Sequence, residues 1–259
     1  MRRALPARGR IGAAFLTALL IGGLLALING PWLRVSRVAW AGERYTPAIQ
    51  LQRALASLDG TALLTVDASA VAERLLRLPA VSHATVETVL PDSVKVHIVE
   101  KVATIVWQTS AVRLLGSADG TLIGQLALGA DLPADIAALP LVDDRRVGSR
   151  DLIVGDRIDA SALAAALLLS EVEPAALGSK AVDLRVRLTD ADGFLLVSDE
   201  PGWEADFGFY PDADDGAPGA LEERVEAQVT AVRTLFSFEG EGTVSWVDAR
   251  DPRRVYWRP

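Results

Sequence analysis

The chain has 259 residues, of which 50% are hydrophobic and 23% are charged. This length accommodates one or two folded units with a substantial core, and the composition excludes a chain that is disordered throughout. The net charge of −8 is uneven, because the first 30 residues hold four arginines and no acid. The remaining acidic body repels nucleic-acid phosphates, so nucleic-acid binding is not predicted. The lack of cysteine excludes disulfide frameworks and thiolate zinc sites.

An uncharged segment near the N-terminus predicts one membrane-spanning helix over residues 11–31. Ile11–Ile28 holds no charged residue and the uncharged run extends to Leu33, whereas a bilayer span needs about 20 such residues. Four arginines precede the segment and two follow it, so residues 1–10 are expected in the cytoplasm and the bulk of the chain outside. A cleaved signal peptide is the alternative, although the segment lacks the small-residue pair that cleavage requires.

Small residues recur every four positions in this segment, at Ala14, Ala18, Gly22, Ala26 and Gly30. Such spacing permits the close approach of a second helix in lipid. Each four-residue step drifts by about 40° around a helix with about 3.6 residues per turn, so the positions form a wrapped stripe. The stripe indicates either a surface for a partner helix or an ordinary membrane span.

The next segment, residues 35–101, predicts a small α+β unit in the order strand, helix, helix, strand, strand. Apolar spacing places Leu51, Leu55 and Leu58 on one helix face, and Asp67 is a capping residue for the second helix. The expected elements are a strand over Val35–Ala41, a helix that starts with a Thr46 cap and Pro47 and stops at Gly60, the helix after Asp67, and two strands joined by a turn at Leu90–Ser93.

Residues 102–259 predict a strand-rich unit with a late helix and a terminal hairpin. Asp119-Gly120 is a hairpin turn signal, and Leu139–Val142 fits either a loop or a short strand. The expected elements are strands over Thr104–Trp107, Val112–Leu115, Thr121–Ile123, Val182–Leu188, Gly193–Val197 and Trp203–Phe209, helices over Ala160–Glu171 and Leu221–Phe236, and a hairpin of Thr243–Asp248 with Arg254–Trp257.

This order and several short motifs resemble the FtsQ/DivIB family of cell-division proteins. The first unit is similar to the FtsQ-type POTRA domain in the motifs Val35-x-x-Val38-x-x-x-Gly42, Leu78-Pro79-x-Val81, Leu90-Pro91 and Val99-Glu100-Lys101-x-Ala103. Lys101 stands where the family usually has arginine, and Trp246–Pro252 resembles the family's late strand. The resemblance implies an α+β chain with a single N-terminal transmembrane helix, a POTRA-like βααββ domain at residues 35–101, and a β-rich C-terminal domain at residues 102–259.

The resemblance also implies a function. Family members are non-catalytic scaffolds of the division machinery, held in the plasma membrane at the septum by one helix with its N-terminus in the cytoplasm. They add a strand from FtsB, itself coiled with FtsL, to their own last strand, which implies Arg250, Val255, Tyr256 and Trp257 as contacts. Further division proteins are expected to meet the POTRA-like domain and the membrane helix.

The chemistry of the terminal hairpin favours such docking independently. The last strand of an open sheet exposes unpaired N–H and C=O groups, and large aromatic residues are favoured at binding hot spots. Arg250, Arg253, Arg254 and Arg258 form a basic island in an acidic body, which suits an acidic partner segment. Together with what the resemblance implies, the sequence therefore predicts partner binding at Arg250, Arg254, Val255, Tyr256 and Trp257. The alternative is that Tyr256 and Trp257 close the core.

Signatures of catalysis are missing from the sequence, which has no G-x-S-x-G, P-loop or G-x-G-x-x-G motif. His83 and His97 alternate with apolar neighbours and are expected to face solvent. No catalytic residue, cofactor or metal ligand is predicted. Two alternatives remain. One is a membrane-tethered extracytoplasmic hydrolase with carboxylates such as Asp143-Asp144 or Asp199-Glu200 in an acidic cleft. The other is a POTRA-type chaperone of envelope assembly, a role that normally accompanies a barrel.

Overall fold

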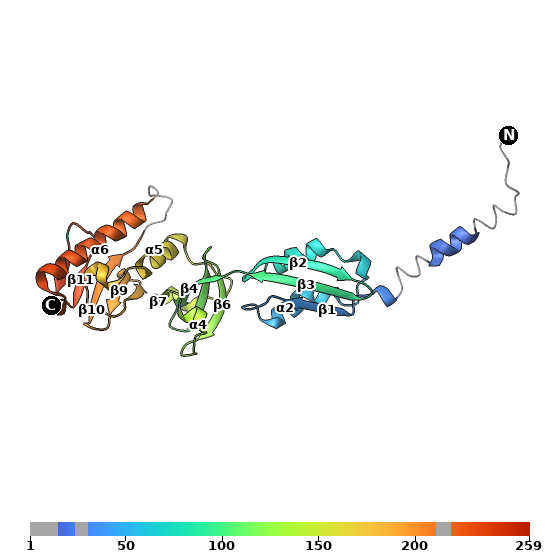
Figure 1. Ribbon diagram of the computed structural model, residues 1–259, viewed down its shortest axis with the longest axis horizontal. Coiled ribbons are helices and arrows are strands. Elements are labelled where there is room, and N and C mark those ends of the chain that lie inside the picture. The colour runs from blue at the N-terminus through green and yellow to red at the C-terminus, as the bar shows by residue number, and fades with distance from the viewer. Residues whose placement is uncertain (1–14, 24–30, 211–218) are drawn as a thin grey trace, which may run out of the picture. The chain divides into compact units, whose positions relative to one another are not determined.

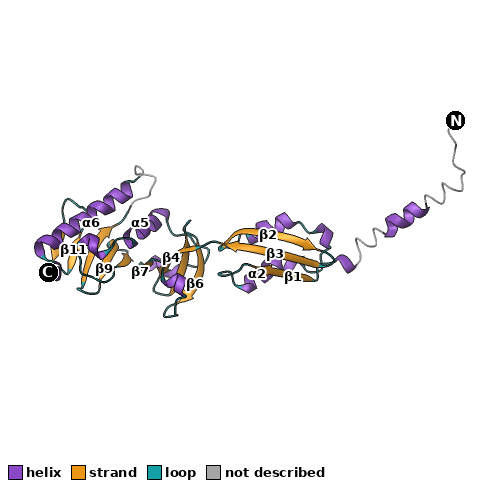
Figure 2. Ribbon diagram, viewed as in Figure 1, coloured by secondary structure: helices purple, strands orange, loops and turns teal. Residues whose placement is uncertain are grey.

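The structure, a computed structural model, describes residues 15–23, 31–210 and 219–259 (Figure 1). The chain divides into two compact units, Met1–Glu100 and Lys101–Pro259. Both units combine helices with strands (Figure 2). The predicted α+β class is therefore confirmed for the part of the chain that follows the N-terminal segment.

The predicted membrane helix falls mostly outside the described residues, as do residues 1–10. Residues 15–23 are helical, but among the described residues no helix combines the length and the apolar character that a bilayer crossing requires. Ala14, Ala26 and Gly30 of the small-residue stripe are not among the described residues. A Cβ on Gly22 would touch nothing within 4 Å, so the membrane span and its packing stripe stay predictions.

The first unit is a three-stranded sheet with its core between the strands and two helices. The strand order is β1-β3-β2, with β1 parallel to β3 and β2 antiparallel to it. Buried residues of both helices share one apolar cluster with alternate residues of β3. The elements are β1 (Arg37–Ala41), α2 (Ala48–Leu55), α3 (Ala68–Leu75), β2 (Val81–Val89) and β3 (Ser93–Glu100), with short 3-10 turns η1 (Pro31–Leu33), η2 (Ala56–Leu58) and η3 (Leu63–Thr65).

The predicted order of the first unit is confirmed, but the start of α2 differs from the prediction. Asp67 caps α3 as predicted, since its carboxylate accepts bonds from the backbone N–H groups of the first turn. The predicted cap of α2 by Thr46 is wrong, because Pro47 occupies the cap position and Thr46 Oγ1 is buried without a partner. Instead, the Glu100 carboxylate accepts bonds from the three backbone N–H groups of residues 44–46, at 2.8, 2.6 and 2.9 Å.

β1 begins at Arg37, two residues later than predicted, because the chain before it pairs elsewhere. The Val35 N–H donates to the Thr61 carbonyl and the Val35 carbonyl accepts from the Gly60 N–H, both at 2.9 Å. Arg34 forms an isolated β-bridge with Ala62. This pairing turns Val35 into the core, where it is 2% exposed.

The second unit is built on a nine-stranded sheet with the order β12-β11-β10-β9-β8-β7-β4-β5-β6. The pairs β4–β7, β7–β8 and β10–β11 are parallel, and the remaining neighbours are antiparallel. The strands are β4 (Ala103–Gln108), β5 (Val112–Ser117), β6 (Leu122–Ala127), β7 (Leu141–Asp144), β8 (Arg185–Thr189), β9 (Gly193–Ser198), β10 (Trp203–Gly208), β11 (Trp246–Asp248) and β12 (Tyr256–Arg258).

The core of the second unit lies between one face of this sheet and the helices α5 and α6. Trp107, Trp203 and Phe207 are fully buried there against apolar residues of both helices. Both predicted helices and the order of the predicted strands are confirmed, and Leu139–Val142, which fitted either a loop or a strand, contributes to β7. The predicted bounds of the hairpin are wrong, because β11 starts at Trp246 after the turn η7, and β12 starts at Tyr256, two residues later than predicted. β8 likewise starts at Arg185, three residues later than predicted. The helical elements are α4 (Ala134–Ala137), η4 (Val147–Asp151), α5 (Ala160–Ser170), η5 (Pro174–Leu177), α6 (Ala220–Glu239) and η7 (Glu241–Thr243).

Replacing Gly42 by alanine should destabilise the first unit, because Gly42 has φ +100° and an added Cβ would lie 2.0 Å from the Ile98 carbonyl oxygen. We expect Gly42→Ala to cost at least about 2 kcal/mol of unfolding free energy. Gly60 is the matched control, since it has φ +69° but open space around an added Cβ. Gly60→Ala should cost only about 1 kcal/mol. Urea unfolding measures both, and equal costs would contradict the close approach at Gly42.

Candidate functional site

The last strand, β12, occupies one end of the nine-stranded sheet. It pairs antiparallel with β11 in the register Trp246↔Arg258, Val247↔Trp257 and Asp248↔Tyr256, and among the described residues no strand lies on its other side. Tyr256 is 61% exposed and Trp257 is 36% exposed. The alternative in which these two residues close the core is therefore wrong. An edge strand of this kind has backbone N–H and C=O groups available to another chain.

The hairpin is fixed to the rest of the sheet through β11 and one buried amide. β11 pairs in parallel with three residues of β10, and Gln228 of α6 is fully buried beside them. The Gln228 side-chain nitrogen donates to the carbonyls of Phe207, at 2.8 Å, and Ala249, at 3.0 Å. Its oxygen accepts from the Tyr210 hydroxyl at 2.8 Å. Because Ala249 directly follows β11, Gln228 ties the start of the hairpin loop to α6 and β10.

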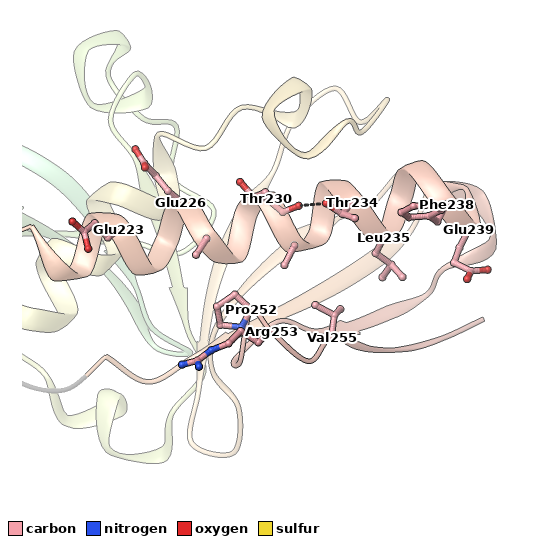
Figure 3. Close-up of a pocket in the computed structure, with 12 residues that line it drawn as sticks. Glu223, Glu226, Thr230, Thr234, Leu235, Phe238, Glu239, Pro252, Arg253 and Val255 are labelled. Carbon is pink, nitrogen blue, oxygen red and sulfur yellow. Dashed lines mark hydrogen bonds between the residues drawn. The ribbon is translucent and has the colours of Figure 1, made fainter.

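A groove of about 1000 Å³ lies between α6 and the segment that leads into β12 (Figure 3). Leu235 and Phe238 of α6 face it, with Val255 on the opposite wall (Figure 3). Phe238 is 83% exposed. The charged residues that line the groove are Glu223, Glu226, Glu239 and Arg253. The groove therefore offers apolar surface under a mainly negative rim, directly beside the edge strand.

The arginines of the hairpin differ in what they contact. Arg250 donates from Nε to Asp248 at 2.8 Å, and its Nη2 binds the same carboxylate. Its aliphatic stem packs on Gly208, where an added Cβ would lie 2.9 Å from the Arg250 Cγ. Arg258 lies over the Trp246 ring, 4.5 Å from the ring centre. These two arginines therefore stabilise the hairpin through contacts with its own residues and with β10.

Arg253 and Arg254 are bound less tightly within the hairpin than Arg250 and Arg258. The Arg253 side chain is 93% exposed, and its nearest carboxylate, on Asp251, is 4.0 Å away. Arg254 is exposed and forms no ion pair within the part of the chain that the structure describes. The predicted basic island is thus smaller than the sequence indicated. A contact of Arg250 or Arg254 with a partner stays a prediction.

A buried carboxylate lies under the hairpin. Asp206 of β10 is 1% exposed, accepts a bond from Trp246 Nε1 at 3.1 Å through Oδ2, and has no partner at Oδ1. Burial raises the pKa of Asp206 to about 6, and the charges of Asp192 and Asp248 act in the same direction. The Trp246 hydrogen bond and the Arg250 charge oppose that rise. The protonation of Asp206 therefore changes in the neutral to mildly acidic range, next to β11.

The carboxylates that could have supported a hydrolase are engaged elsewhere. Asp144 is fully buried and accepts a bond from Trp107 Nε1 at 2.9 Å. Within the described residues, no group of three or more histidine or acidic side chains could hold a metal ion. The arginine partners of these acids form the ion pairs Asp144–Arg146 at 2.7 Å, Asp143–Arg145 at 2.8 Å and Asp199–Arg185. These acids therefore give no support to an acid–base pair in a cleft.

Comparison with known proteins matches part of the chain. Residues 33–101 match the family model of the POTRA domain, FtsQ-type. This segment therefore resembles an FtsQ-type POTRA domain, and we refer to it below as the POTRA domain. The chain is also similar to the cell division protein FtsQ of Vibrio cholerae serotype O1, with 35% identity over 111 residues, which is 39% of this chain and 42% of that protein. The resemblance to the FtsQ/DivIB family is confirmed, over a match that spans less than half of either chain.

The sheet face of the POTRA domain that points away from its helices is open. His83 and His97 are exposed on it, as predicted. A depression of about 310 Å³ lies on this sheet, between Ala39 of β1, Thr85 of β2 and Lys95 of β3. The POTRA domain therefore offers a polar strand surface, and its expected role in binding further division proteins stays a prediction.

Two residues that shape the site were missed by the sequence analysis. Gln228 lies three positions after Val225 and four before Val232, so its place on the apolar face of the late helix was a usable signal. Asp206 lies between the buried residues Ala205 and Phe207, and strand alternation placed it on the other face of the sheet. No pattern in the sequence indicates that this second face of the sheet is also buried at β10.

The ionised form of Asp206 should cost the second unit stability. Because its pKa is raised, the cost is present above pH about 6 and fades as the pH falls and the acid takes up its proton. We expect Asp206→Asn, which keeps an acceptor for Trp246, to add about 1–2 kcal/mol at pH 7.5 and about 1 kcal/mol less at pH 5. Urea unfolding at both pH values measures this difference.

The control for this experiment is Asp183→Asn, which changes an exposed acid of the same unit. It should leave the unfolding free energy within about 0.5 kcal/mol at both pH values. A gain for Asp206→Asn that does not depend on pH would contradict the assignment of the cost to an ionised carboxylate.

Proposed function

We propose that this chain is a membrane-anchored, non-catalytic scaffold of the bacterial cell-division machinery. The FtsQ-type POTRA domain and the similarity to the Vibrio cholerae division protein support this role. The edge strand β12 and the groove beside it supply a surface for protein binding, and they carry the proposal for the C-terminal unit. We place the protein in the plasma membrane at the division septum, with its N-terminus in the cytoplasm.

The N-terminal helix supports the anchor. Within residues 15–23, five large apolar side chains are each more than half exposed, and their spacing distributes them around the helix axis. A helix that is apolar on all sides is stable when lipid or protein covers it. The exposed residues are Phe15, Leu16, Leu19, Leu20 and Ile21.

The proposed docking mode is the addition of a strand to β12. A segment from an FtsB/FtsL-like coiled coil would pair with the free side of β12, so that backbone bonds supply affinity and alternate side chains supply selectivity. The contact residues proposed on this chain are Arg250, Arg254, Val255, Tyr256 and Trp257. The exposure of Arg250, Arg254, Tyr256 and Trp257 supports the proposal, as does the position of β12 at the end of the sheet. Val255 is half-buried and lines the groove.

The two faces of β12 favour different side chains on the incoming strand. Trp257 pairs with Val247, which is buried in the core on the α6 side, so Trp257 shares that side with the groove. Side chains entering there would meet Phe238 and a mainly acidic rim, which favours apolar residues flanked by basic ones. Tyr256 and Arg258 occupy the opposite face, which together with the exposed Arg254 favours an acidic residue.

Truncating the edge aromatic tests this proposal. We expect Trp257→Ala to weaken binding of the full-length chain to a purified FtsB/FtsL-like coiled coil by at least about 30-fold, which corresponds to a loss of about 2 kcal/mol. The reason is that Trp257 supplies apolar contact where the added strand would cross the groove. Titration calorimetry or fluorescence anisotropy in detergent measures the dissociation constant.

The control variant is Val182→Ala, since Val182 is 94% exposed and lies outside the hairpin and the groove. It should leave the dissociation constant unchanged. Binding that tolerates Trp257→Ala and also survives deletion of residues 254–259 would contradict docking at β12.

A further inference from the structure

One end of the POTRA domain gathers three exposed, large apolar side chains. Trp32 is 75% exposed, Leu64 is 57% exposed and Leu90 is 67% exposed. They come from three parts of the chain, namely η1, η3 and the turn between β2 and β3. Neighbouring side chains such as Leu63 point into the core instead, since Leu63 is only 2% exposed.

Backbone pairing holds these three parts together. Arg34 forms a β-bridge with Ala62, so Trp32 and Leu64 each lie two residues from a paired position. On the other side, the Ser36 N–H donates to the Asp92 carbonyl at 2.9 Å. Asp92 in turn lies two residues after Leu90. All three apolar residues therefore sit at the end of the sheet where β1 and β3 begin.

The charged groups at this end balance one another. Arg37 donates to Asp92 at 2.8 Å, and this bond together with those from neighbouring serines lowers the pKa of Asp92 to about 2, so the pair stays ionised. Arg34 donates to the Gly60 carbonyl at 2.9 Å, and Asp59 is the adjacent exposed acid. Because the charges cancel, the surface is distinguished by its apolar side chains.

We propose that Trp32, Leu64 and Leu90 insert into the interfacial layer of the bilayer that anchors the chain. This inference rests on the proposed anchor, because the predicted span over residues 11–31 ends directly before Trp32. One residue of extended chain reaches about 3.6 Å, so Trp32 lies at the level of the lipid headgroups. Tryptophan is enriched at that level, where its ring meets apolar chains and its N–H stays near water.

Insertion would orient the POTRA domain with this end against the membrane. Three attachment points from separate segments resist tilting, whereas a single flexible connection does not. The driving force is the burial of apolar area, so an uncharged lipid surface is sufficient. The far end of the domain, where α2 begins and β1 ends, would point away from the bilayer.

Single cysteines test this orientation, because the chain has no cysteine of its own. We use the full chain in phosphatidylcholine vesicles, with a polarity-sensitive fluorophore on Leu64→Cys or Leu90→Cys. Ile49→Cys is the matched control, since Ile49 is 51% exposed and lies at the far end of the same domain. Lipids that carry a quencher at the headgroup or upper chain should reduce emission at positions 64 and 90 by about twofold or more, and at position 49 hardly at all.

The outcomes separate this inference from the proposed anchor. If the chain floats with the vesicles and all three labels stay in water, the proposed insertion is contradicted, whereas the proposed membrane anchor is not. If the chain fails to float with vesicles, both are wrong. Emission shifts that follow protein concentration, without quenching by lipid, would show that a second copy covers these residues and would also overturn the inference.

Discussion

The parallel pairing of β11 with β10 determines what the C-terminal end of this protein can do. Only three residue pairs form it, and the chain reaches it from α6 rather than from a neighbouring strand. Gln228 reinforces the pairing by bonding the carbonyl of Phe207 in β10 and that of Ala249, which follows β11. Each of its buried partners would cost about 1–3 kcal/mol if left unbonded. The edge strand β12 has a fixed position because β11 does.

The same region concentrates the side chains that connect β12 to the sheet. The Trp246 indole binds the buried Asp206 through its N–H, while its ring carries Arg258 of β12. Arg250 closes the hairpin loop by binding Asp248 and covering Gly208. The strand that we propose as the docking edge is thus rigid on its inner side and unpaired on its outer side, which suits it to receive a partner strand without reorganising.

The parts of the fold that were predictable from sequence are those fixed by local spacing. Leu51, Leu55 and Leu58 are buried as their helical spacing predicts, and Asp67 caps the helix that follows it. The start of α2 was not predictable, because the turn before it, residues 44–46, donates its backbone N–H groups to Glu100, more than fifty residues away. Long-range partners of this kind leave no periodic signal in the chain.

The candidate site shows the same division. The hairpin and the exposure of its aromatic side chains follow from the alternation of residues along the strands and from turn chemistry. The sequence does not distinguish the four hairpin arginines. In the structure, however, Arg250 binds Asp248 and Arg258 stacks on the ring of Trp246. The groove beside β12 depends on where α6 crosses the sheet. Gln228 and the core set that crossing, and the spacing of residues along the sequence does not reveal it.

Hydrogen exchange at β12 tests the central claim most directly. The backbone amides of Tyr256–Arg258 are compared in the free chain and in the chain bound to an FtsB/FtsL-like coiled coil. If β12 receives a strand, its outward amides exchange quickly in the free chain and slow by at least about 100-fold in the complex, while β10 amides keep their rates. Stable binding that leaves β12 exchange unchanged would contradict strand addition at this edge.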